Sequence, residues 1–207
     1  KGLGFKAGIS LIHYSNANFR APNTSTNTMA FNAGLVYDLD GGTEIEYIHR
    51  EKEKVTEPLR YNFALRTGLN ESDVIDSGQY GFVVLSAYAD KRLGRKSAIQ
   101  VGSDVYFSNF LKELIRYQSI AFPENNVSAD DDFKRVGVFV GHELFINQMS
   151  IISQLGYYVY YPFDFEGRMY NRMGLKRYFG DKVYGAITLK SHGAKAEAVE
   201  FGIGIRL

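Results

Sequence analysis

A histidine and a serine stand two residues apart at His13 and Ser15, and this pair has the residue types for nucleophilic chemistry. In an extended strand, residues i and i+2 project from the same face, so the imidazole and the hydroxyl come within reach of each other. That arrangement is the minimum for a serine activated by a histidine base. Backbone N–H groups after Ser15, or the amide of Asn16 or Asn23, are candidates for stabilising an oxyanion. A hydrogen-bonded cluster at a strand end is the alternative that the pair alone leaves open.

Two runs of alternating apolar residues flank this pair and would position it. In residues 3–11 every odd position is apolar and the even positions are Gly, Lys or Ser, and residues 29–37 carry a second apolar series at odd positions. His13 and Ser15 continue the first series, and Asn27 directly precedes the second. We therefore expect these three polar side chains on the apolar face, at one rim of a sheet, joined by the loop between the runs.

The composition indicates an all-β protein, because the 207 residues include 21 Gly, 15 Tyr and 15 Phe but only 4 Pro. The alternating runs have about ten to twelve residues, close to the ~9–11 that a tilted strand needs to cross a bilayer. We predict an antiparallel transmembrane β-barrel of about 8–12 strands, as a single domain over residues 1–207. The expected further strands are 60–71, 79–93, 97–107, 136–146, 149–161, 168–179, 183–192 and 199–207, with a less regular one near 44–50.

Other features of the sequence fit the same fold. Some connections between the runs are short and others are long, which is typical of barrels with long loops on one rim and short turns on the other. Residues 110–117 have the spacing of a short amphipathic helix packed at the rim. In the expected strand 136–146, His142 belongs to the alternate residues that face outward. Charged residues of the opposite parity are expected to fill the lumen as a paired network: Glu143, Lys190, His192, Glu200 and Arg206.

Charge and composition exclude several classes of function. The net charge is +1, with both signs mixed along the chain, so we expect no basic face for nucleic acid. Cysteine is absent, which removes disulfides and thiol chemistry. No phosphate-binding loop or zinc motif occurs, and we expect neither a metal nor a cofactor. A soluble, lipocalin-like barrel with its apolar faces inside stays open, because composition does not separate it from a membrane barrel.

Longer segments of the sequence resemble a known family. Residues 13–23, HYSNANFRAPN, resemble the signature of the outer-membrane lipid A 3-O-deacylases and related acyloxyacyl hydrolase-like proteins. Residues 141–163 and 189–207 resemble the Bacteroidetes-type form of that family. The resemblance implies a barrel in the bacterial outer membrane with a serine hydrolase site on its exterior. The implied substrate is lipid A of lipopolysaccharide, from which an ester-linked acyl chain is removed, and membrane lipids and other outer-membrane proteins are the implied partners.

The resemblance also assigns roles to residues of the signature. Ser15 would be the nucleophile and His13 its general base, with Asn16 and Asn23 near the oxyanion. Asn27 stands where the family has the acid that orients the histidine. An amide can hold an imidazole by a hydrogen bond but supplies no negative charge, so we expect weaker catalysis. Similar family members have further strands before the signature, and such strands are expected to lie outside this chain.

Besides the soluble, lipocalin-like barrel, the sequence therefore leaves two functional hypotheses. The first is a serine esterase that removes an acyl chain from lipid A in the outer leaflet. The second is a catalytically weak or inactive barrel that acts as a structural or accessory subunit of an outer-membrane complex, and Asn27 is the residue that favours it.

Overall fold

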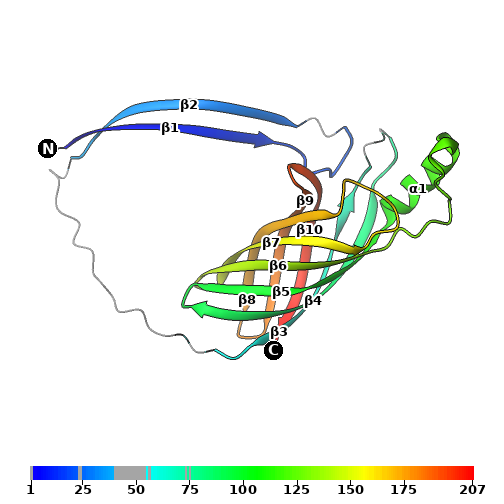
Figure 1. The fold of residues 1–207 in the computed structure, drawn as a ribbon. Coiled ribbons are helices and arrows are strands. Elements are labelled where there is room, and N and C mark those ends of the chain that lie inside the picture. Colours follow the sequence, from blue (N-terminus) through cyan, green and yellow to red (C-terminus); the bar gives the residue numbers. More distant parts are fainter. Residues whose placement is uncertain (1, 23–24, 40–54, 56, 73, 75) are drawn as a thin grey trace. The chain divides into compact units, whose positions relative to one another are not determined.

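The chain forms two compact units in the computed structural model, which describes residues 2–22, 25–39, 55, 57–72, 74 and 76–207. One comprises Lys1–Asn16 and Thr24–Lys52 and is called the hairpin unit below. The other comprises Ala17–Asn23 and Glu53–Leu207 and is called the barrel unit. Figure 1 shows the strands and helices of both. No described helix is long and apolar enough to cross a membrane.

The hairpin unit consists of two long antiparallel strands, β1 (Leu3–Tyr14) and β2 (Thr26–Tyr37). Their register runs from Leu3 opposite Tyr37 to Tyr14 opposite Thr26, without a bulge. Directly opposed residues share a face of the sheet, so the apolar series predicted for the two runs form one apolar face. The predicted alternation is confirmed for both strands.

The barrel unit closes on itself with eight antiparallel strands, in the order β10-β3-β4-β5-β6-β7-β8-β9. The strands are β3 (Arg60–Asn70), β4 (Tyr80–Gly94), β5 (Ser97–Ser108), β6 (Arg135–Ile146), β7 (Met149–Tyr160), β8 (Met169–Phe179), β9 (Val183–His192) and β10 (Lys195–Arg206). The predicted antiparallel barrel is confirmed, and its strand number lies within the predicted range. The barrel closes through β10 and β3, whereas β1 and β2 form a separate sheet. The strand predicted near 44–50 lies outside the described residues, and the single domain over 1–207 stays a prediction.

The two ends of the barrel differ in the length of their connections. Strands β4 and β5, β6 and β7, and β8 and β9 are joined by tight turns at one end, which we call the short-turn end. At the other end a long connection between β5 and β6 contains α1 (Asn109–Ala121) and the 3-10 helix η1 (Pro123–Asn125). The helix predicted over 110–117 is confirmed and extends to Ala121. Its apolar side packs on Phe163 of the β7–β8 loop through a buried cluster: Phe110, Leu111, Leu114 and Ile115.

The alternation of the barrel strands separates an apolar wall from a polar lumen. Outward residues are exposed and mostly apolar, among them Leu65, Val101, Val140, Leu175 and Ile203. At the centre of the lumen, Arg172 is fully buried and donates hydrogen bonds to Glu200 over 2.6 Å and to Asp104 over 2.8 Å. Arg66 lies 3.7 Å from Asp104 and 3.9 Å from Glu200. Charges that are buried in this way need such partners.

Two further ion-pair clusters fill the ends of the lumen. Toward the long loops, Arg135 and His192 both contact Glu197, at 2.6 and 2.7 Å. Toward the short turns, Lys176 lies 3.0 Å from Glu143. The residues predicted to face inward all belong to this network: Glu143, Lys190, His192, Glu200 and Arg206. Because large buried side chains occupy the lumen at each level, the lumen is filled by side chains and does not form an open channel.

Replacing Arg172 by alanine is expected to lower the free energy of unfolding of the barrel by about 3–5 kcal/mol, because two buried carboxylates lose their closest cation. Urea unfolding in detergent micelles, followed by far-UV circular dichroism, measures this change. Met173→Ala, at the next residue of β8 but on the exposed wall, is the matched control and should cost less than about 1 kcal/mol. Equal losses in the two variants would contradict the account of the lumen network.

Candidate functional site

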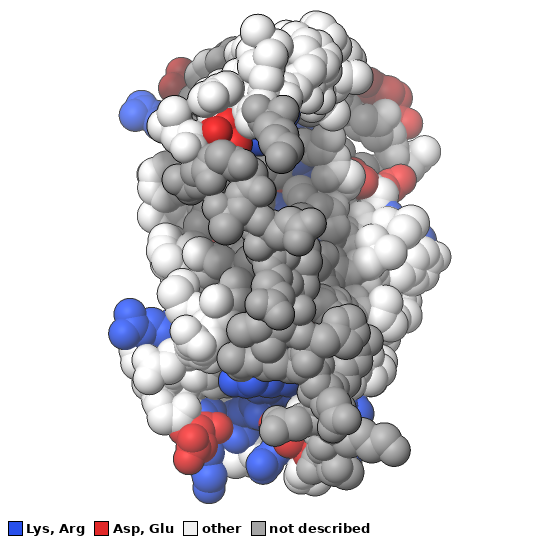
Figure 2. Space-filling model, turned by 90° about the vertical axis from the view of Figure 1, so that its left-hand side faces the viewer, with Lys and Arg blue, Asp and Glu red and all other residues white. Residues whose placement is uncertain are grey.

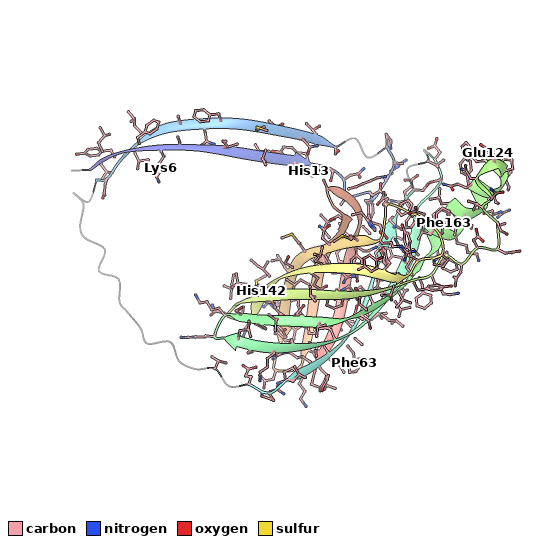
Figure 3. The ribbon with its side chains drawn as sticks, in the orientation of Figure 1. Lys6, His13, Phe63, Glu124, His142 and Phe163 are labelled. Carbon is pink, nitrogen blue, oxygen red and sulfur yellow. The ribbon has the colours of Figure 1, made fainter. Side chains whose placement is uncertain are left out.

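The hairpin register brings His13 and Asn27 together. They are direct partners across β1 and β2, one pair beyond the Leu11–Met29 pair of the apolar face. The imidazole Nδ1 of His13 lies 2.7 Å from the amide Oδ1 of Asn27, and both side chains are exposed. Figure 3 shows His13 toward one end of the hairpin and Lys6 toward the other. The histidine therefore stands at the end of the apolar face, with the amide behind it.

The contact with Asn27 favours one tautomer of His13. In the orientation that the structure gives the amide, its oxygen faces Nδ1, and because an amide oxygen only accepts hydrogen bonds, this arrangement places the proton of the neutral imidazole on Nδ1. The lone pair is then on Nε2, which is the nitrogen that takes the proton from a nucleophile in serine hydrolases. In this tautomer, the Asn27 amide orients the ring as a carboxylate would, without adding its negative charge.

Ser15 and Asn16 follow directly after the end of β1 and are exposed. Both belong to the same compact unit as His13 and Asn27. A hydroxyl in this position is accessible to a substrate from outside, which a serine nucleophile requires. Asn23, the other residue predicted near the oxyanion, lies outside the described residues.

An apolar track leads along the hairpin to these polar groups. On the same face, the Leu11–Met29 pair is next to the His13–Asn27 pair and the Ile9–Phe31 pair follows it, and the four side chains are 73–78% exposed. On the opposite face Asn32 donates a hydrogen bond to Ser10 over 2.9 Å. The two faces therefore differ in chemistry, and the apolar one suits the hydrocarbon chain of a lipid.

A second His–Ser pair, which no local sequence pattern indicates, lies on the outer wall of the barrel. Ser97 at the start of β5 and His142 in β6 are joined by a hydrogen bond of 2.7 Å between Oγ and Nε2. The outward orientation predicted for His142 is confirmed. Within the described part of the chain, His142 has no other hydrogen-bonded side chain, so the orienting partner that His13 has in Asn27 is missing. These two residues are 45 apart in the sequence, and only the register of β5 and β6 brings them together.

The described residues contain no group of three His, Asp or Glu side chains that could hold a metal ion.

The closed barrel, with its apolar wall and its lumen of paired charges, has the architecture of membrane-spanning β-barrels. Two family models match the chain: acyloxyacyl hydrolase, C-terminal domain, over residues 59–207, and lipid A 3-O-deacylase (PagL) over residues 1–36. The chain belongs to this family of outer-membrane β-barrel enzymes that act on lipid A. The resemblance seen in the sequence is thus confirmed. Comparisons with curated proteins and with solved structures found no match.

The two family models match different parts of the chain. The deacylase model covers β1 and nearly all of β2, including His13, Ser15 and Asn27. The acyloxyacyl hydrolase model covers the whole closed barrel, from before β3 to the end of β10. The candidate catalytic residues and the closed barrel therefore belong to separate parts of the chain.

Proposed function

We propose that this protein is a serine esterase that removes an ester-linked acyl chain from lipid A of lipopolysaccharide in the bacterial outer membrane. The observation that carries the proposal is the 2.7 Å contact between His13 and Asn27 at the end of an apolar face, in a segment matched by the lipid A 3-O-deacylase model. Ser15 is the nucleophile, His13 is the general base, and Asn27 orients His13.

The reaction proceeds through an acyl-enzyme. The Oγ of Ser15 attacks the carbonyl carbon of the acyl ester, and its proton passes to Nε2 of His13. Backbone N–H groups after Ser15 and the amide of Asn16 stabilise the tetrahedral oxyanion, with Asn23 as a further candidate donor. Collapse of this intermediate breaks the bond to the lipid A oxygen, which takes the proton from His13. Water, activated by the same histidine, then hydrolyses the acyl-enzyme and releases a fatty acid.

The apolar face of the hairpin supports a substrate whose acyl chain stays in the membrane. Leu11 and Met29 directly adjoin the His13–Asn27 pair, so a hydrocarbon chain lying on them would place its carboxyl carbon near the catalytic groups. The polar headgroup of lipid A would then remain at the rim. This arrangement explains why a hydrolase would place its nucleophile outside a sheet and not in an enclosed pocket.

A membrane location also sets a condition on the hairpin. Backbone N–H and C=O groups need hydrogen-bond partners inside hydrocarbon, and a two-stranded sheet leaves its outer edges without them. Among the described strands, β1 and β2 pair only with each other. We therefore expect further strands to flank the hairpin when the site is in the membrane.

Asn27 also favours a second candidate function, a barrel that is catalytically weak or inactive and serves as an accessory subunit of an outer-membrane complex. Without a carboxylate behind His13, the imidazolium formed during the reaction lacks a counter-charge. Purification of the protein from membranes with a partner in fixed ratio, together with unchanged lipid A, would favour this function.

The proposed esterase is tested by expressing the natural full-length protein in a bacterium whose lipid A structure is known. Mass spectrometry should show lipid A species lighter by one acyl chain, and the matching free fatty acid should appear in the same cells. Folding in the outer membrane is checked by the mobility shift between unheated and heated protein on gels. Unchanged lipid A beside folded protein would rule out the esterase.

A further inference from the structure

An arginine interrupts the apolar wall of the barrel near the short-turn end. In β8 the residues Tyr170, Arg172 and Lys176 point inward and are buried, whereas Arg177 belongs to the exposed, outward series. Its outward neighbours along the strand are Leu175 and Phe179. A cation on a lipid-facing wall is costly unless it reaches water or an anionic group at the membrane surface.

Among the described residues, Arg177 has no counter-charge of the kind that the lumen arginines have. Arg66, Arg135 and Arg172 each lie within 4.0 Å of a carboxylate. No carboxylate of the described residues lies that close to Arg177, whose guanidinium carbon lies 5.8 Å from the ring centre of Phe179. The charge is therefore available to an anion from outside the protein.

A groove of about 650 Å³ adjoins this arginine on the outer wall. It is formed by β7, β8 and the turn between β6 and β7, and its lining includes Asn147, Met149, Ile151, Leu175 and Arg177. Met149 is the direct partner of Arg177, and Ile151 is the direct partner of Leu175 one step further from the turn. The groove thus has a cation at the turn end and an apolar floor that runs toward the middle of the barrel.

The position of the groove indicates which lipid leaflet it meets. Outer-membrane barrels have their short turns on the periplasmic side and their longer loops outside the cell. The groove lies at the short-turn end, where Arg95, Lys96 and Lys182 are also exposed. Figure 2 shows several Lys and Arg side chains, with a few Asp and Glu side chains beside them, in the lower part of its view. Basic groups at this level attract anionic lipid headgroups.

We propose that this groove binds a glycerophospholipid of the periplasmic leaflet. The guanidinium of Arg177 holds the phosphate, and an acyl chain lies along Met149, Ile151 and Leu175. A guanidinium and a phosphate form paired, charge-assisted hydrogen bonds, which gives the site its preference for a phosphate-bearing headgroup. The proposal uses the membrane location of the barrel and is independent of catalysis by Ser15.

The test measures lipid bound to the natural full-length protein, purified in detergent and titrated with phosphatidylglycerol under native mass spectrometry. Wild-type protein should bind one phosphatidylglycerol in preference to a neutral diacylglycerol. Arg177→Gln should weaken this binding about tenfold, as expected for loss of a charge-assisted contact. Arg95→Gln, at an exposed turn of the same end but outside the groove, is the matched control and should bind like wild type.

A second variant tests the apolar part of the groove without changing charge. Leu175→Trp should fill the floor and reduce lipid binding, while the gel mobility shift shows that the barrel is folded. Three results would overturn the proposal: equal binding by Arg177→Gln and wild type, equal losses in Arg177→Gln and Arg95→Gln, or a dimer mass that Leu175→Trp abolishes. The last result would make a second copy of the chain the occupant of the groove. Lipid A analysis of the same variants separates this test from the esterase, because a failure of lipid binding leaves deacylation by Ser15 unaffected.

Discussion

Replacing Ser15 by alanine is expected to leave the protein folded in the outer membrane and to abolish its effect on lipid A. The variant lacks the oxygen that forms the acyl-enzyme, and loss of a serine nucleophile lowers the rate by roughly 10³-fold or more. The measurement is the fraction of lipid A that has lost one acyl chain, at equal amounts of folded protein. His13→Ala is expected to have an effect of similar size, since serine and histidine act as one unit.

The second His–Ser pair provides the matched control for this experiment. Ser97→Ala removes a hydroxyl that lies 2.7 Å from Nε2 of His142, a histidine for which the described residues provide no orienting side chain. Its deacylation should equal that of the natural protein. If Ser97→Ala lost activity and Ser15→Ala kept it, the reactive serine would be on the barrel and the hairpin assignment would be wrong.

Changing Asn27 to aspartate is expected to raise the rate of deacylation, but by less than about 10⁴-fold, because Asn27 already holds His13 in the tautomer that an amide in this position can otherwise disturb. The two side chains have the same shape, so the 2.7 Å contact with Nδ1 of His13 can be kept while a negative charge is added. That charge stabilises the imidazolium that forms when Ser15 loses its proton. Initial rates of fatty acid release from purified lipid A, with purified variants in detergent, measure the gain.

Asn27→Leu separates the orienting role of this position from its charge. Leucine has nearly the same size but accepts no hydrogen bond, so His13 loses the contact that fixes its tautomer, and the rate should fall below that of the natural protein. The expected order of rates is therefore Asp above Asn above Leu. Identical rates for all three would mean that residue 27 neither orients the imidazole of His13 nor stabilises its charge.

The hairpin unit and the barrel unit have different roles in the proposed function. The hairpin carries the predicted nucleophile and base, whereas the barrel carries the buried ion pairs and the arginine groove. Variants in the lumen, such as Arg172→Ala, should act through the stability of the barrel. Variants of His13, Ser15 and Asn27 should act on the reaction alone, because these side chains are exposed and support no core.

The strands of the barrel could be read from the sequence because lumen and lipid impose opposite chemistry on alternate residues. The prediction for 79–93 matches β4 (Tyr80–Gly94) within one residue at each end. The last strand was predicted from residue 199, but β10 begins at Lys195. Its first residues include Ala196, Glu197 and Ala198, all buried, and the ladder with β9 is irregular there. This irregularity hid the start of the strand from a period-2 pattern.

Local alternation and contiguous motifs were enough to predict the fold class, most of the strand positions, the shared face of His13 and Asn27, and the family. Closure of the barrel through β3 and β10, which leaves β1 and β2 as a separate sheet, was visible only in the folded chain. The same holds for the pairing of Arg172 with Asp104 and Glu200, the contact of Ser97 with His142, and the groove beside Arg177. These contacts join residues distant in the chain, and strand register, which no local pattern contains, sets which of them meet.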